Sequence, residues 1–235
     1  MLKRELEMGL WSELENDITS CRACPRLVAW REEVARVKRR AYRDEKYWGK
    51  PVPGFGDQHG RVLVIGLAPA AHGANRTGRL FTGDSSGDFL YAALHRAGFA
   101  SQPTSRHRGD GLALHDVFIS AVCRCAPPDN KPAPDEIAAC RPFLERERAL
   151  PDLRVVVALG RVAFDAALRH FASAEDAATR PAFGHAAAYP LADGRWLVAS
   201  YHPSRQNTQT GRLTAEMFDR VWTQVKQRLA SDLAP

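Results

Sequence analysis

The sequence lacks a hydrophobic run long enough to form a membrane-spanning helix. Its longest apolar stretches, residues 62–71 and 155–160, are far shorter than the roughly 20 residues that cross a bilayer. An uninterrupted apolar segment of the kind found in export signals is also missing near Met1, because acidic residues stand at positions 5, 7, 13 and 15. We therefore expect a cytoplasmic protein with no membrane partner.

The sequence also lacks the short motifs of several common enzyme classes. Gly-x-Ser-x-Gly, which marks the nucleophile of many serine hydrolases, does not occur. The Walker A pattern of nucleotide hydrolases and the glycine fingerprint of dinucleotide-binding proteins are absent as well. The missing fingerprint argues against a nicotinamide- or flavin-dependent redox enzyme. Because neither repeats nor a clear linker interrupt the 235 residues, we expect one domain spanning residues 1–235.

Cysteine is present in an odd number, which disfavours a framework of disulfide bonds. Two of the five form Cys21-x2-Cys24, and the others are Cys123, Cys125 and Cys140. Four thiolates that converge on one centre suit either zinc or an iron–sulfur cluster, and the ligand types do not distinguish these two. The alternative is a set of buried free cysteines, which the grouping of the thiols makes less favoured.

Charge of both signs is abundant, with 33 Lys and Arg against 27 Asp and Glu, for a net charge of +6. The excess is concentrated in residues 26–50, where nine basic side chains accompany four acidic ones, with the aromatic residues Tyr42, Tyr47 and Trp48 among them. Such a segment is compatible with binding to nucleic acid, although a run of charges is more often a solvated surface.

Short apolar runs alternate with amphipathic segments along most of the chain. The runs at residues 61–66, 117–122, 155–160 and 196–200 are typical of buried parallel strands. Helical patterns occupy residues 6–16, 135–147, 161–171 and 213–229, and another helix is expected to begin at Ser85 or Ser86, with Asp84 as an alternative cap. This order predicts an α/β fold with helices on both faces of a parallel sheet.

Three chemically unusual loops follow the carboxyl ends of the predicted strands, where α/β proteins bind their ligands. Residues 67–84 are rich in glycine and end in Asp84, residues 124–134 are rich in proline, and residues 201–212 are polar and begin next to His202. Glycines let a backbone approach a ligand closely, and a histidine at a strand end is well placed for catalysis.

These loops together resemble the uracil-DNA glycosylase superfamily, and specifically its family 5, the iron–sulfur branch called type B. The resemblance is carried by GLAPAAHGANRTGRLFTGD (residues 66–84), RCAPPDNKP (124–132) and SYHPSRQNTQTG (200–211). The stretches CRACPRLVAWR (21–31) and PVPGFGD (51–57) also fit. Nearly the whole chain is covered.

The resemblance implies an α/β/α sandwich around a four-stranded parallel sheet, with a [4Fe–4S] cluster. The residues that match the cluster ligands are Cys21, Cys24, Cys125 and Cys140, whereas Cys123 has no role in the family pattern. The implied function is base-excision repair: hydrolysis of the N-glycosidic bond of uracil in DNA, leaving an abasic site. Hypoxanthine and ethenocytosine are implied as further substrates, because Ala68 stands where many superfamily members have Asp or Asn. The implied partner is damaged DNA, and we expect a monomer associated with the nucleoid in a prokaryote.

The resemblance and the chemistry of the reaction together assign roles to individual residues. A carboxylate near the sugar stabilises an oxocarbenium-like transition state, and a hydrogen-bond donor near the base stabilises the leaving group. The expected catalytic residues are Asp84, His202 and Asn130. The expected base-binding residues are Gly66, Leu67, Ala68, Phe81, Asn130 and His202. The expected DNA-contacting residues are Arg76, Arg79, Arg205, Gln206 and Asn207.

A different class remains open from the residues alone. The chain could be a non-catalytic nucleic-acid-binding protein that uses only an iron–sulfur or zinc site and the basic residues 26–50. The presence of both Asp84 and His202 in their loops argues against this class, because a pure binding protein needs neither.

Overall fold

The strands form one mixed sheet in the computed structural model, which describes residues 2–148 and 152–231. The strands are β1 (Phe55–Gly56), β2 (Val62–Gly66), β3 (Val117–Ala121), β4 (Val155–Leu159), β5 (Ala188–Pro190) and β6 (Trp196–Ser200). Their order across the sheet is β1-β3-β2-β4-β6-β5. The four central strands are parallel, and β1 and β5 pair antiparallel to them at the two edges.

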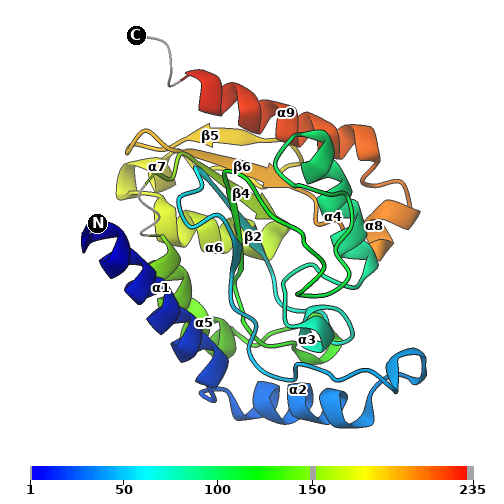
Figure 1. Ribbon diagram of the computed structural model, residues 1–235. Helices are drawn as coiled ribbons and strands as arrows, with labels where there is room; N and C mark the ends of the chain where they lie inside the picture. Colours follow the sequence, from blue (N-terminus) through cyan, green and yellow to red (C-terminus); the bar gives the residue numbers. More distant parts are fainter. Residues whose placement is uncertain (1, 149–151, 232–235) are drawn as a thin grey trace.

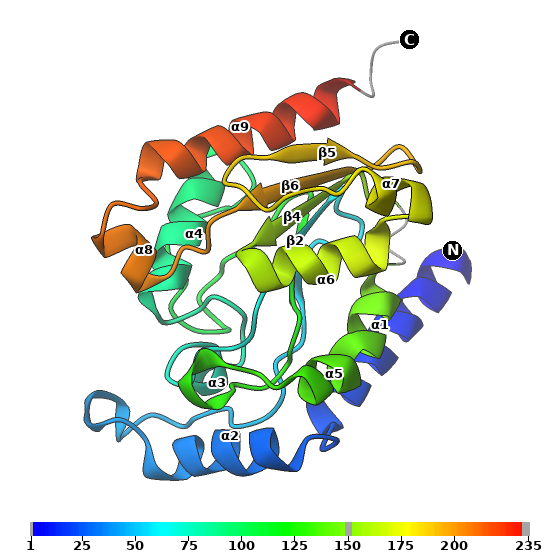
Figure 2. The same cartoon turned by 180° about the vertical axis from the view of Figure 1, so that it is seen from behind.

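Helices cover both faces of this sheet. They are α1 (Leu2–Ser20), α2 (Pro25–Val37), α3 (Ala74–Thr77), α4 (Ser85–Arg96), α5 (Pro134–Glu147), α6 (Arg161–Phe171), α7 (Ala174–Ala178), α8 (Arg205–Gln209) and α9 (Ala215–Ser231), with short 3-10 turns at η1 (Arg40–Tyr42) and η2 (Pro128–Asn130). Figures 1 and 2 show α4 and α9 on one side of the sheet and α6 on the other, with α2 and α3 near one end of the molecule. The expected α/β/α arrangement is therefore confirmed.

The sheet differs from the expected one in its strand number, which is six rather than four. The four predicted strands are the parallel core, and the two that the sequence did not reveal are edge strands. β1 has two residues and β5 has three, ending in Pro190. Segments this short carry no measurable alternation of polar and apolar residues, and proline is tolerated only at a sheet edge or a strand end.

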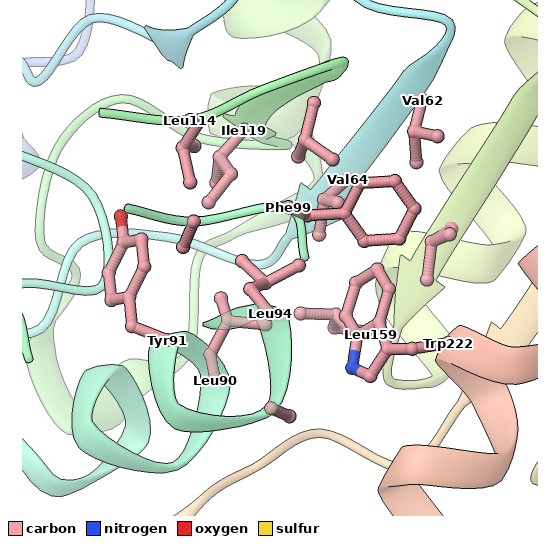
Figure 3. Packing of buried hydrophobic residues seen from close by; sticks show 14 of the residues in the cluster. Val62, Val64, Leu90, Tyr91, Leu94, Phe99, Leu114, Ile119, Leu159 and Trp222 are labelled. Carbon is pink, nitrogen blue, oxygen red and sulfur yellow. The ribbon is translucent and has the colours of Figure 1, made fainter. Parts of the chain in front are cut away.

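The core lies in two layers because successive strand residues point to opposite faces. In β2, Val62 and Val64 pack with α4 and α9, whereas Leu63 and Ile65 pack with α5 and α6. Figure 3 shows the first layer, in which side chains of α4 and Trp222 of α9 approach β2. Burial of each such aliphatic side chain contributes about 1.5–3 kcal/mol, so the strands form a rigid platform.

The parallel register places the carboxyl ends of the central strands side by side. Gly66 pairs with Ala121, and Leu159 pairs with Ser200. The loops that follow these ends therefore leave the sheet along one edge, as the sequence predicted. No helix in the described part of the chain is long and apolar enough to cross a membrane.

Candidate active site and cysteine cluster

Two rings from different loops meet at the carboxyl edge of the sheet. Phe81 comes from the loop between β2 and α4, and His202 follows β6 directly. Their ring centroids are 5.8 Å apart and the ring planes are inclined by 30°. The first and third predicted loops thus build one site, although 121 positions separate these two residues in the sequence.

Phe81 is held by close packing against two glycines. A Cβ on Gly66 would lie 2.7 Å from the Phe81 ring, and one on Gly87 would lie 1.8 Å from the Phe81 carbonyl oxygen. Phe81 also has a positive φ of 50°. This left-handed conformation costs an L-residue roughly 1–2 kcal/mol, and such strain is concentrated at functional sites. Gly66 was expected in the base pocket. Because it has no side chain, the Phe81 ring can lie directly on the backbone of β2.

The carboxylate of Asp84 lies at the beginning of α4. Its Oδ1 accepts the Gly87 N–H at 3.0 Å, so the N-cap is Asp84 and not Ser85 or Ser86. A Cβ on Gly73 would lie 1.9 Å from Oδ2, so the carboxylate packs against bare backbone. Burial raises the pKa of Asp84 above its usual value, and the N–H groups of residues 86 and 87 only partly offset this effect. The sequence suggested two roles for Asp84, a helix cap and a catalytic carboxylate. Asp84 caps α4, and the catalytic role of its buried carboxylate stays a prediction.

Desolvation at the half-buried position of His202 lowers its pKa to about 4, which favours the neutral imidazole near pH 7. The backbone around it is fixed by Asn207, whose Nδ2 donates to the His202 carbonyl oxygen at 2.8 Å. Gly160 at the end of β4 leaves room for it, since a Cβ there would lie 3.3 Å from the Cβ of His202. A neutral imidazole still carries one N–H donor.

The remaining expected base-binding residues surround this pair less closely. Leu67 and Ala68 are half-buried and continue from Gly66, and the Leu67 carbonyl accepts the Cys123 N–H at 2.9 Å. Asn130 is exposed in the turn η2 with a φ of 56°. In the described part of the chain its side chain makes no hydrogen bond, so its place in the site stays a prediction.

Arg76 and Arg79 lie inside the protein rather than on the surface expected for DNA contacts. The Arg76 guanidinium donates to the carbonyl oxygens of His72 and Gly83, both at 2.8 Å. Arg79 is 3% exposed and forms an ion pair with Asp110 at 2.7 Å. These internal contacts favour a structural role, in which the two arginines hold the loop that carries Phe81 and Asp84.

The other expected DNA contacts lie on α8. Arg205 and Gln206 are exposed at its beginning and free to approach a ligand. Asn207 is half-buried, and its amide holds the His202 carbonyl. The geometry thus separates this set into two surface residues and one positioning residue.

The four expected cluster ligands gather from four segments. Cys21 follows α1, Cys24 precedes α2, Cys125 follows β3 and Cys140 lies within α5. Burial raises the pKa of Cys24 and of Cys125 to about 11 each, and the negative charges of Cys21 and Cys140 act on both in the same direction. Among the described residues, no three His, Cys, Asp or Glu side chains converge closely enough to hold a single metal ion. The mutual electrostatic influence of these thiols places them near one another.

Cys123 is placed differently from the other four cysteines. Its side chain is fully buried in the core layer beneath α5, where it contacts Cys140. Arg31, in contrast, donates from Nη1 to the Cys125 Sγ at 2.8 Å, although 94 positions separate them. This arginine was missed in the sequence, because a residue in a basic helix carries no local sign of a distant thiol partner. Its contact gives the buried Cys125 a cationic neighbour, which favours Cys125 over Cys123 as a ligand.

The fold and this site define a class: α/β/α proteins whose candidate site lies in the loops at the carboxyl edge of a parallel sheet. The chain belongs to the uracil DNA glycosylase superfamily, whose profile matches residues 53–226.

Relatives within this family agree with the expected branch. The chain is 58% identical over 211 residues to the type-5 uracil-DNA glycosylase of Thermus thermophilus, covering 89% of this chain and 94% of the relative. It is 53% identical to that of Mycobacterium bovis over 93% of this chain and 82% of the relative. A type-4 uracil-DNA glycosylase of Pyrobaculum aerophilum is 36% identical over only 50% of this chain and 53% of the relative. The resemblance to family 5 is thereby confirmed.

Proposed function

We propose that this chain, as one domain, is a glycosylase that hydrolyses the N-glycosidic bond of uracil in DNA and leaves an abasic site. The observation that carries the proposal is the stacking of Phe81, three residues before Asp84 in its loop, against His202 at the sheet edge where α/β proteins bind ligands. The identity to type-5 uracil-DNA glycosylases over most of both chains supports it.

The reaction requires the target nucleotide to leave the base stack and enter the site. The Phe81 ring supplies a face on which a flipped base stacks, because it is fixed on Gly66 and cannot turn away. Arg205 and Gln206 are exposed on α8 and are proposed to fill the space that the base leaves. DNA containing uracil is thus the proposed partner.

Bond cleavage develops positive charge on the sugar and negative charge on the departing base. The Asp84 carboxylate stabilises the sugar and orients the attacking water, and its partial desolvation strengthens that interaction. The neutral His202 donates an N–H to a carbonyl oxygen of the base as charge builds there. Asn130 is proposed to bind the base or the water through its amide.

The substrate range is proposed to extend beyond uracil. Ala68 has no polar group with which to read a uracil edge, and its small side chain leaves room next to Gly66. We propose that hypoxanthine and ethenocytosine are also excised.

The first prediction is base release from DNA containing a single lesion. Purified protein incubated with a duplex carrying one deoxyuridine is expected to yield an alkali-labile abasic site, seen as strand cleavage on a denaturing gel. Duplexes with hypoxanthine or ethenocytosine are expected to be cleaved as well. Release of uracil alone would restrict the substrate range, and binding without any release would favour a non-catalytic nucleic-acid-binding protein.

We further propose that Cys21, Cys24, Cys125 and Cys140 hold a [4Fe–4S] cluster. When bound, the cluster would supply a covalent link between α1, α2, α5 and the loop after β3, which hydrolysis itself does not need. Within the chain, the Arg31 guanidinium is 2% exposed and offsets the negative charge that thiolate ligands would bring. Free cysteines of this kind suit a reducing cytoplasm.

The second prediction separates Cys125 from Cys123. The Cys125→Ser variant is expected to lose bound iron and acid-labile sulfide, because one of four ligands is removed. The matched Cys123→Ala variant is expected to keep both, since Cys123 lies outside the four cysteines that match the ligands of the family. Iron and sulfide per chain and the visible absorption spectrum are the measurements, together with thermal unfolding. Loss of iron from the Cys123 variant alone would reverse the assignment.

A further inference from the structure

The segment between α2 and β1 presents a row of cations to solvent. We call residues 38–50 the basic arm; it begins at the end of α2 and contains η1. Arg39, Arg40, Arg43 and Lys46 are exposed along it, and a shallow hollow with a single acidic residue is lined by the three arginines. In the described part of the chain, the side chains of Arg39, Arg40 and Lys46 have no hydrogen bond or ion pair. The sky-blue segment projects from the end of the molecule where α3 lies (Figures 1 and 2).

The inner side of the basic arm is anchored to the loop that carries the site. The Trp48 N–H donates to the Arg76 carbonyl at 2.8 Å, and the Gly49 N–H donates to the Asn75 carbonyl at 3.0 Å. The Tyr47 hydroxyl is 3.0 Å from His72 Nδ1. The main chain of the arm is therefore hydrogen-bonded to α3, and these bonds fix the position of the arm relative to the loop that carries the site.

Arg76 extends this anchorage to Asp84. Its guanidinium lies 3.9 Å from the centre of the Tyr42 ring and pairs with Glu45, both in the basic arm. The same guanidinium donates at 2.8 Å to the carbonyl of Gly83, the residue before Asp84. One buried arginine thus joins the arm to the residue that precedes the expected catalytic Asp84.

The side chains of the arm are divided by chemistry. Its aromatic and acidic groups that contact α3 face inward, and its unpaired cations face outward. A merely solvated charged loop would need neither this division nor a fixed distance to the site. Guanidinium groups bind phosphate oxygens through paired hydrogen bonds, and release of counterions from DNA drives such contacts.

We propose that the basic arm binds phosphates of the DNA backbone beside the flipped nucleotide and so sets the position of the strand over Asp84. The proposal rests on the proposed function for its choice of DNA as the partner. It assigns to Arg39, Arg40 and Lys46 the backbone contacts that the buried Arg76 and Arg79 are placed too deeply to make.

The test is the salt dependence of binding to a duplex with a stable abasic-site analogue. The triple variant R39Q/R40Q/K46Q is expected to raise the Kd about tenfold or more, and to reduce the slope of log Kd against log salt by about 0.9 for each phosphate that it no longer neutralises. The protein concentration that half-saturates single-turnover release of uracil is expected to rise by a similar factor, because the arm contributes to binding of the DNA.

The matched control is R169Q/R180Q/K226Q, which removes the same charge from exposed positions on α6, after α7 and on α9. It is expected to leave the salt slope unchanged. The variant R39K/R40K, which keeps the charge, is expected to retain most of the slope of the unchanged chain. Equal slopes for the arm and control variants would overturn the proposal. Uracil release by the unchanged chain is measured separately. If uracil is released but the arm variant has an unchanged salt slope, the role of the arm is rejected and the glycosylase stands. If the arm variant reduces the slope but the unchanged chain releases no uracil, the glycosylase is rejected and the arm remains a DNA-binding segment.

Discussion

Asp84→Asn is expected to lower the single-turnover rate of uracil release by about 10²–10⁴-fold. The substitution removes the negative charge that stabilises the sugar, and it removes the acceptor that orients water. Asn still caps a helix through its side-chain oxygen, so α4 keeps its first turn and the protein its stability. The measurement is the rate of abasic-site formation with enzyme in excess over a uracil duplex.

The control is Asp88→Asn, in the same first helical turn but exposed, which is expected to change the rate by less than about threefold. Asp84→Ala additionally loses the cap, at a cost of about 1 kcal/mol in the free energy of unfolding. A rate for Asp84→Asn close to that of the unchanged chain, with a lower rate only for the alanine variant, would reduce Asp84 to a helix cap.

The pH dependence of the rate follows from the same carboxylate. Because burial raises the pKa of Asp84, the rate is expected to fall as the solution becomes acidic, at a pH above the usual range for aspartate. Asp84→Asn is expected to flatten this acid limb.

His202→Ala is expected to lower the single-turnover rate by about 10²–10³-fold, the usual loss when one donor to a developing anion is removed. With a pKa of about 4, His202 is neutral between pH 6 and 8, so this factor is expected to be the same at both values. A factor that shrinks toward one at pH 8 would mean that an imidazolium of ordinary pKa is the active form.

The same shift predicts the direction of an effect on stability. The folded protein keeps His202 neutral, whereas the unfolded chain takes up a proton near pH 6.5, so unfolding binds a proton between about pH 4 and 6.5. Stability is therefore lost as the pH falls through this window, and His202→Ala is expected to reduce that loss. Thermal unfolding from pH 4 to 8 measures it, with the exposed His115→Ala as the control.

The helices and strands show which elements the local pattern of apolar residues predicts. Helix α6 and strand β6 have the predicted bounds, residues 161–171 and 196–200, because apolar periodicity and a preceding glycine or polar turn define both. The segment between them holds α7 and β5, which were not predicted. Short elements depend on partners elsewhere, so nothing in their own residues reveals them.

The site residues divide along the same line. Asp84 and His202 could be selected because a strand end is recognisable in the sequence, and their loops follow strand ends. Arg76, Arg79 and Asn207 have the residue types of DNA contacts, yet their side chains bond to carbonyl oxygens or to Asp110 within the protein. The sequence around an arginine or an asparagine is the same whether its side chain faces DNA or a backbone carbonyl, so the sequence alone does not identify the partner.

Residue types and short spacings were sufficient to predict the α/β class, the three loops at the sheet edge, the cysteine set and the family. Burial in a parallel sheet imposes such patterns directly on neighbouring positions. The folded chain was needed to show which cations face solvent, that Arg31 contacts Cys125, and that Arg76 links the basic arm to Gly83, the residue before Asp84. Those arrangements depend on contacts between residues far apart in the chain, and such contacts form only when the helices and loops pack around the completed sheet.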